Sequence, residues 1–310
     1  YKEFLDRSFP FLEATVDMRE IAPVGTMDNL VPRAIILPLA HDVYVCFDTE
    51  LLRVAGIWKG GFLTPRGLAM LSYDVPLKKM GGGQKDLPKP MGEVVFSTGL
   101  YPGWQRPGAY GFEDPRSKWV DERELGRGPL EPSVGEWQGI EDLGEAAELH
   151  YSLFGGQVRE RFEAREVNGR IVVTRSIELK NVDGKVGLVA NDSGPGKEAS
   201  AVRIGGLALL EERYAVIESE GEDSIVLDYW IDEANVSVGQ VDDAERVTKQ
   251  SAHWMESAIS GIEMGEAQGA YAVDEAILPY PNPWERRIRP VAIDFFPNGD
   301  AVVLTFDGDV

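Results

Sequence analysis

Residues 148–179 read ELHYSLFGGQVRERFEAREVNGRIVVTRSIEL, and this stretch decides the fold class. In its first part, polar residues such as His150 alternate with apolar residues such as Tyr151, the period-two pattern of a strand with one buried face. A Gly-Gly pair then turns the chain, and the run 170–179 repeats the alternation. The stretch therefore predicts successive antiparallel strands joined by tight turns.

Short apolar runs with the same character lie on both sides of this stretch, and the later ones follow at roughly ten-residue spacing. They are Ala34–Leu39, Val43–Phe47, Leu51–Trp58, Val186–Ala190, Ala201–Ile204, Leu207–Glu218 and Ser224–Trp230. Closely spaced runs with Gly between them favour antiparallel sheet over alternating strands and helices. We predict a mainly β protein built as a large antiparallel β-sandwich. Asp242–Ile262 is the best helix candidate.

The sequence divides into three parts. We expect a sandwich domain over residues 1–277, with a long irregular Pro/Gly-rich insertion at about 75–146, and a Pro-rich connector over 278–288. In 289–310, RPVAIDFFPNGDAVVLTFDGDV, alternating runs flank a Pro-Asn-Gly turn, which predicts a β-hairpin. Because a lone hairpin is marginally stable, we expect the polypeptide to continue into a further domain.

The chain is strongly acidic, with 31 Lys and Arg against 52 Asp and Glu and a net charge of −21. Such a surface repels phosphate groups, so we expect neither a nucleic acid partner nor an anionic membrane surface. There is no apolar run of 18 residues, and we expect no membrane span. The chain opens at Tyr1 without a Met, consistent with a removed signal peptide, and we expect a periplasmic or secreted protein.

The cysteine and histidine content argues against a local metal or haem motif. Cys46 is the one cysteine, and its apolar run predicts a buried small side chain rather than a nucleophile. Neither CxxC nor CxxCH occurs, and His41, His150 and His253 form no HxH or HExxH pattern. We therefore expect no metal site and no cofactor. His150, close to Glu148 on a strand, is a weak candidate for a catalytic base, the alternative being a structural histidine.

Calcium is the one ion for which acidic clusters offer ligands. Glu218–Asp223 and the pair Asp242-Asp243 supply carboxylates, but they lack the alternating DxDxDG spacing that places oxygens around one ion. Solvated turns are the alternative interpretation of both clusters.

The segment 98–115 holds the densest group of aromatic, Gly and Pro residues in the chain. Aromatic faces cover the C–H groups of sugar rings, while carboxylate and guanidinium groups bind the hydroxyls. We therefore predict a carbohydrate-binding surface; the alternative is that the aromatic residues fix a long loop onto the sheet. The predicted ligand-binding residues are Tyr101, Trp104, Tyr110, Phe112, Asp114 and Arg116.

Four stretches resemble an uncharacterised bacterial domain near the start of large exported proteins. They are Asn29–Arg33, Cys46–Gly60, Thr98–Trp104 and Asp121–Leu130. In those proteins the domain precedes a β-propeller similar to glucose/sorbosone dehydrogenases, often with a c-type cytochrome module. The resemblance implies that 289–310 matches the first propeller strands. It carries no catalytic residues, because none are assigned in the family. The meander of strands is also similar to galactose mutarotase-like supersandwiches, a likeness at the level of fold alone.

Three functional hypotheses remain open from the sequence. The leading one is an accessory module of an exported sugar-oxidising protein, not catalytic by itself, whose partner is a carbohydrate or the neighbouring propeller domain. The second is a sugar-active enzyme, either a hydrolase, a lyase or an epimerase, with a cleft on the sandwich. The third is a purely structural module packed on the propeller.

Overall fold

The computed structural model describes most of the 310-residue chain. The described residues are 10–19, 29–64, 87–117, 127–143, 146–182, 184–190, 202–206, 209–211, 213–219, 221–231, 257–267, 269–283 and 288–305. The chain divides into two compact units, one over Arg7–Ser251 and the other over Ala252–Val310 together with Tyr1–Asp6.

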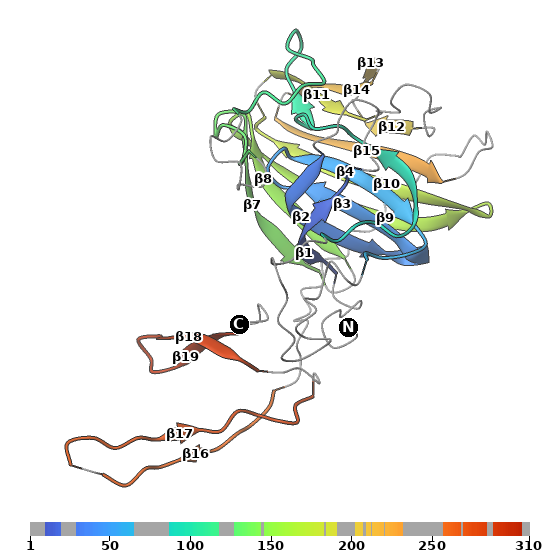
Figure 1. Ribbon diagram of the computed structural model, residues 1–310. Helices are drawn as coiled ribbons and strands as arrows, with labels where there is room; N and C mark the ends of the chain where they lie inside the picture. Colours follow the sequence, from blue (N-terminus) through green and yellow to red (C-terminus); the bar gives the residue numbers. More distant parts are fainter. Residues whose placement is uncertain are drawn as a thin grey trace. The chain divides into compact units, whose positions relative to one another are not determined.

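The first sheet of the larger unit has five antiparallel strands in chain order, shown in blue to teal in Figure 1. The strands are β1 (Leu12–Asp17), β2 (Leu30–Leu39), β3 (Val43–Asp48), β4 (Arg53–Lys59) and β5 (Glu93–Ser97). A short 3-10 turn, Ala40–Asp42, joins β2 to β3. The apolar runs predicted from sequence at 34–58 are therefore confirmed as neighbouring strands.

The second sheet has six antiparallel strands in the order β12-β15-β10-β9-β8-β7. The strands are β7 (Gly135–Asp142), β8 (Ala147–Leu153), β9 (Gly156–Val167), β10 (Arg170–Lys180), β12 (Val202–Gly206) and β15 (Glu222–Ile231). Asn168 and Gly169, with φ of 53° and 77°, form the tight turn between β9 and β10. The alternation in 148–179 is thus confirmed as three consecutive antiparallel strands.

A third sheet has four strands in the order β13-β14-β11-β6. The strands are β6 (Trp104–Gln105), β11 (Gly184–Val189), β13 (Leu209–Glu211) and β14 (Tyr214–Ser219). β6 pairs with β11 through Leu188 and Trp104, so the aromatic loop enters this sheet.

The three sheets share one hydrophobic core, which makes the larger unit a β-sandwich. Phe47 of the first sheet lies 5.8 Å from Tyr151 of the second, ring centre to ring centre. Trp104 of the third sheet donates a hydrogen bond to the same tyrosine. The first and third sheets therefore both pack on the inner face of the six-stranded sheet. The prediction of a mainly β, antiparallel sandwich is confirmed.

A charged pair lies inside this core. Glu160 is 0% exposed and Arg175 is 1% exposed, and Arg175 Nε donates to Glu160 Oε1 at 2.5 Å. The hydroxyl of Tyr151 donates to Glu160 Oε2 at 2.8 Å, and Trp104 Nε1 donates to that hydroxyl at 2.9 Å. Burial and the adjacent Glu160 hold the pKa of Tyr151 well above its usual value. This network joins two facing sheets through polar contacts.

Residues 75–146, expected to form an irregular insertion, contribute a strand to each of the three sheets. β5 pairs with β4, β6 with β11 and β7 with β8. β6 and β7 are hard to detect in the sequence because β6 has two residues and β7 carries two glycines with a bulge between Trp137 and Gly139.

The smaller unit contains two two-stranded sheets among its described residues. They pair β16 (Ile262–Glu263) with β17 (Glu275–Ala276), and β18 (Pro290–Phe295) with β19 (Ala301–Thr305). The second pair confirms the predicted hairpin, with Gly299 at φ 91° in its turn. The helix candidate Asp242–Ile262 lies mostly outside the described residues, and 257–261 are not helical. Within the part of the chain described here, no helix has the length and apolar character needed to cross a membrane.

Candidate functional site

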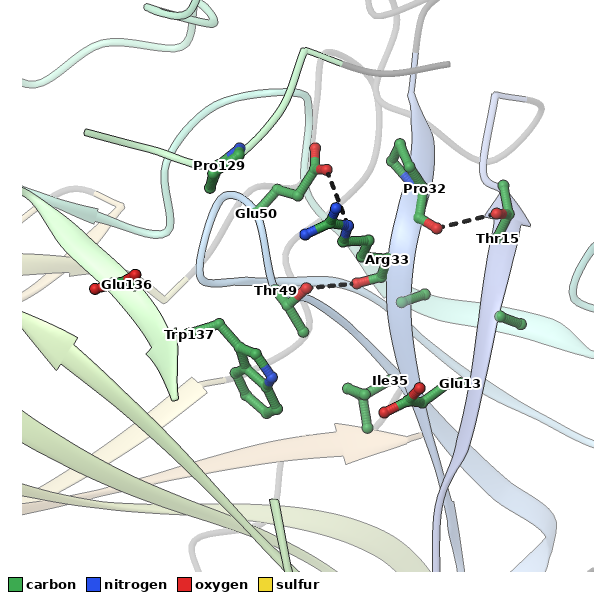
Figure 2. A pocket seen from close by; sticks show the side chains of 12 residues that line it. Glu13, Thr15, Pro32, Arg33, Ile35, Thr49, Glu50, Pro129, Glu136 and Trp137 are labelled. Carbon is green, nitrogen blue, oxygen red and sulfur yellow. Dashed lines mark hydrogen bonds and ion pairs between the residues drawn. The ribbon is translucent and has the colours of Figure 1, made fainter. Parts of the chain in front are cut away.

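A pocket of ≈ 530 Å³ opens on the larger unit beside β1, β2 and β7 (Figure 2). Its lining combines an indole, three carboxylates and a guanidinium with small and apolar groups. The lining residues are Glu13, Ala14, Thr15, Pro32, Arg33, Ala34, Ile35, Thr49, Glu50, Pro129, Glu136 and Trp137. A volume of this size holds a small organic ligand, since such pockets measure about 300–1,000 Å³.

A β-bulge places Arg33 at the pocket. The pairing of β1 with β2 shifts between Ala14 and Val16, so that Pro32 and Arg33 together lie opposite Thr15. The Thr15 hydroxyl donates to the Pro32 carbonyl at 2.9 Å, and the Thr49 hydroxyl donates to the Arg33 carbonyl at 2.9 Å (Figure 2). The backbone is therefore fixed on both sides of the bulge, while the Arg33 side chain stays 75% exposed.

A buried arginine fixes the turn that carries Glu50. Arg53, 1% exposed, donates from Nε to Asp48 Oδ2 at 3.0 Å, from Nη2 to Asn29 Oδ1 at 2.6 Å, and from Nη1 to the carbonyl of Gly99 at 2.7 Å. The other oxygen of Asp48 accepts a hydrogen bond from the backbone N–H of Glu50 at 3.0 Å. The position of Glu50 thus depends on Arg53 through Asp48.

Glu50 is a buried carboxylate with two arginine neighbours. It is 6% exposed, and its oxygens lie 3.1 Å from Arg116 Nη1 and 3.9 Å from Arg33 Nε. Burial raises the pKa of Glu50, and the nearby Asp48 adds to the rise, while the two arginines oppose it. A buried carboxyl group with a perturbed pKa inside a pocket is a common feature of functional sites.

Trp137 supplies the aromatic surface of the pocket. It comes from β7 of the six-stranded sheet and is partly buried, with its ring centre 5.9 Å from that of Phe47. Figure 2 shows Trp137, Arg33 and Glu50 around the same pocket. One side of the indole is thereby supported by the core, which gives a ligand a rigid apolar face.

Residues 45–160 match the family model described as Domain of unknown function (DUF6797). The match covers somewhat more than a third of the chain and takes in Thr49, Glu50, Pro129, Glu136 and Trp137 of the pocket. No curated protein and no solved structure matches the chain.

The aromatic residues predicted to bind a ligand all lie within the DUF6797 match, but none of them lines this pocket. Trp104 belongs to β6 of the third sheet, and the other three lie outside the strands. Trp104 and Tyr101 are each 1% exposed. Tyr110 stacks on Tyr214 with ring centres 4.0 Å apart, and Phe112, 41% exposed, meets the edge of Tyr101. The rings of Tyr101, Tyr110 and Phe112 pack against β14, whereas Trp104 lies in the main core. Phe112 is the one of the four with a large exposed surface.

The two charged residues of the predicted set form an ion pair that reaches the pocket. Arg116 donates from Nε and Nη2 to the two oxygens of Asp114, each at 2.9 Å, and also donates to the carbonyl of Gly128. Its Nη1 donates to Glu50. Arg116 therefore contacts the pocket lining through Glu50, which it helps to position, although it does not itself line the pocket.

His150, the weak candidate for a catalytic base, lies away from the pocket on the outer face of β8. Its Nε2 lies 2.9 Å from Glu148 Oε1 and 3.6 Å from Glu141 Oε2. Glu148 is also held by Arg161, whose Nε lies 2.7 Å from Oε2. The structure thus brings His150 together with Glu148 of the same strand and Glu141 of the neighbouring strand β7.

Sequence reasoning missed Arg33 and Trp137. A signal for the first was present, because a proline beside an arginine inside the apolar run of β2 indicates a bulge or a strand edge. Trp137 carried no such signal, since a tryptophan in a short Gly-flanked strand is equally compatible with a core position.

Proposed function

We propose that this chain is a carbohydrate-binding module of an exported sugar-dehydrogenase-like protein, with no catalytic activity of its own. The observation that carries the proposal is the composition of the pocket, where the indole of Trp137 lies beside Arg33 and Glu50. A sugar presents C–H groups on one face and hydroxyls around its rim, which suit an aromatic face ringed by charged hydrogen-bonding groups.

The contacts that hold Arg33 and Glu50 in place favour ligand binding over a purely structural role. A bulge, two threonine hydroxyls and the Arg53–Asp48 pair fix the backbone around Arg33 and Glu50. A backbone that is already fixed loses little conformational freedom when a ligand binds, which favours affinity. The resemblance of the sequence to domains that precede a propeller supplies the larger context of the proposal, with the neighbouring domain as the other partner.

The test is isothermal titration of the chain with a panel of soluble neutral and acidic oligosaccharides, with tryptophan fluorescence as a second readout. We expect at least one glycan to bind. Trp137→Ala should weaken that binding about tenfold, because an aromatic stack contributes about 0.5–1.5 kcal/mol beyond its area. Arg33→Ala should weaken it as well, whereas Trp137→Phe should retain most of the affinity.

Arg159→Ala is the matched control for Arg33→Ala, because Arg159 is also an exposed arginine but does not line the pocket. Equal affinity in the wild type, Trp137→Ala and Arg33→Ala would contradict the proposed site. A panel without any binding would contradict the proposed function. If sugar products are released during the titration, and if this release is lost in Glu50→Gln, the chain is a sugar-active enzyme rather than a binding module.

A further inference from the structure

Three side chains that are common metal ligands lie together on the outer face of the six-stranded sheet. Glu148 and His150 are two residues apart on β8 and therefore lie on the same face. Glu141 of β7 lies directly opposite Glu148 in the antiparallel register. Their donor atoms all lie within 4.8 Å of one another.

The distances between these donor atoms suit a single small cation. His150 Nε2 is 2.9 Å from Glu148 Oε1 and 3.6 Å from Glu141 Oε2. Zinc bound tetrahedrally with bonds of about 2.0–2.2 Å separates its ligand atoms by about 3.3–3.6 Å. The 2.9 Å distance is shorter than that separation and the 3.6 Å distance is close to it, while the oxygens of Glu141 and Glu148 lie within 4.8 Å of each other. Movement of the partly exposed Glu141 and His150 side chains would therefore bring the three donors around one ion.

Two neighbouring arginines contact Glu148, but its Oε1 atom still faces His150. Arg161 contacts Oε2 at 2.7 Å and thereby orients Oε1 towards His150. Metal-binding carboxylates are commonly held by such an outer partner. Arg159 lies 3.9 Å from Oε1, but its side chain is 59% exposed and can extend into solvent.

The surface above the three side chains has room for further ligands. Gly139 lies opposite His150 on β7, and a Cβ atom at that position would meet nothing within 4 Å. His150 and Glu141 are 28% and 40% exposed. Water therefore has access to complete the coordination of an ion, as it does in three-ligand zinc sites.

We propose that Glu141, Glu148 and His150 bind one divalent transition-metal ion. Imidazole with carboxylates is a ligand set suited to zinc and its neighbours in the first transition row. The sequence predicts no metal site because a local histidine motif is absent, but the third ligand, Glu141, comes from the neighbouring strand β7. The proposal is independent of the carbohydrate pocket, which contains none of these residues.

The test is a titration of the metal-free chain with Zn²⁺ at pH 7.5, followed by calorimetry, with Co²⁺ absorption as a second readout. We expect one ion per chain and a higher midpoint of thermal unfolding when zinc is present. His150→Ala and Glu141→Gln should each weaken zinc binding tenfold or more, as should Glu148→Gln. Glu163→Gln, an exposed carboxylate on the same face of β9, is the matched control and should bind as the wild type does.

Removal of a repulsive charge gives a second, gain-of-binding variant. Arg159→Gln should strengthen zinc binding, because it removes a cation 3.9 Å from a proposed ligand oxygen. A cysteine is a poor competitor for zinc here, since burial raises the pKa of Cys46 and disfavours its thiolate.

The proposal is overturned if the folded wild type binds no zinc. It is also overturned if zinc affinity is the same in the wild type, His150→Ala and Arg159→Gln.

Discussion

Strands β9 and β18 have the same alternating sequence pattern but very different surroundings. In β9 every second residue from Gly156 to Ala164 is buried, and the residues between them are exposed or partly exposed. In β18 all six residues are exposed, with Val291, Ile293 and Phe295 at 58%, 60% and 67%. Alternation therefore specifies a strand and its two faces, whereas burial depends on a second layer.

In the larger unit, a second layer of strands covers the buried face of each sheet. Its three sheets contribute to one hydrophobic core, and that core is tight enough to enclose the Glu160–Arg175 pair. The described residues of the smaller unit form only two two-stranded sheets, which offer little area for mutual burial. Three predictions rest on these differences in burial, in order of decreasing effect, and the second compares the two units directly.

The largest effect should come from the charged pair inside the sandwich. Arg175→Met leaves the Glu160 carboxylate buried without its cation, and we expect a loss of about 3–5 kcal/mol in the free energy of unfolding. Urea denaturation followed by near-ultraviolet circular dichroism measures this loss.

The double variant Glu160→Leu/Arg175→Met is the control for the charge effect. It removes both charges and should lose less stability than Arg175→Met alone, since a buried ion pair contributes little over apolar residues of similar volume. A double variant that is less stable than the single one would show that hydrogen bonds from Tyr151, not the unpaired charge, dominate.

A matched pair of isoleucines compares the two units directly. Ile177 of β10 is 1% exposed, so Ile177→Ala should cost about 2–5 kcal/mol through lost burial and a cavity. Ile293 of β18 is 60% exposed, and Ile293→Ala should change stability by about 0.5 kcal/mol or less. Both are measured by chemical denaturation, and comparable losses at the two positions would mean that Ile293 is covered in solution.

The smallest effect should be the pH dependence from Glu50. Because burial raises its pKa in the folded state, the folded chain holds this proton more tightly than the unfolded chain, whose glutamates titrate near pH 4.3. The contribution of Glu50 to stability is therefore present below about pH 4.3 and decreases as pH rises through the folded value.

The comparison of interest is the difference in unfolding free energy between the wild type and Glu50→Gln, measured at intervals from pH 4 to pH 8. We expect the wild type to lose stability relative to Glu50→Gln as pH increases. A difference that grows in favour of the wild type over this range would indicate that Arg116 and Arg33 outweigh burial.

Sequence patterns predicted the local elements but not the contacts between sheets. The strands in 148–179 and the hairpin at 290–305 follow from alternation and turn residues, which act over a few positions. The burial of Trp104 depends on Tyr151, 47 residues away, and its aromatic neighbours in the sequence gave no sign of that partner. The same holds for the Glu141–Glu148 juxtaposition, which is set by strand register.

The side chain of Arg53 connects parts of the chain that are distant in sequence. It bonds to Asn29, 24 positions before it, and to Thr98 and Gly99, 45 and 46 positions after it. A segment that separates from this side chain leaves its guanidinium with unmet donors in a buried environment, so its other partners are weakened as well. Amide hydrogens around Asn29, Asp48 and Thr98 should therefore exchange with deuterium as one cooperative group.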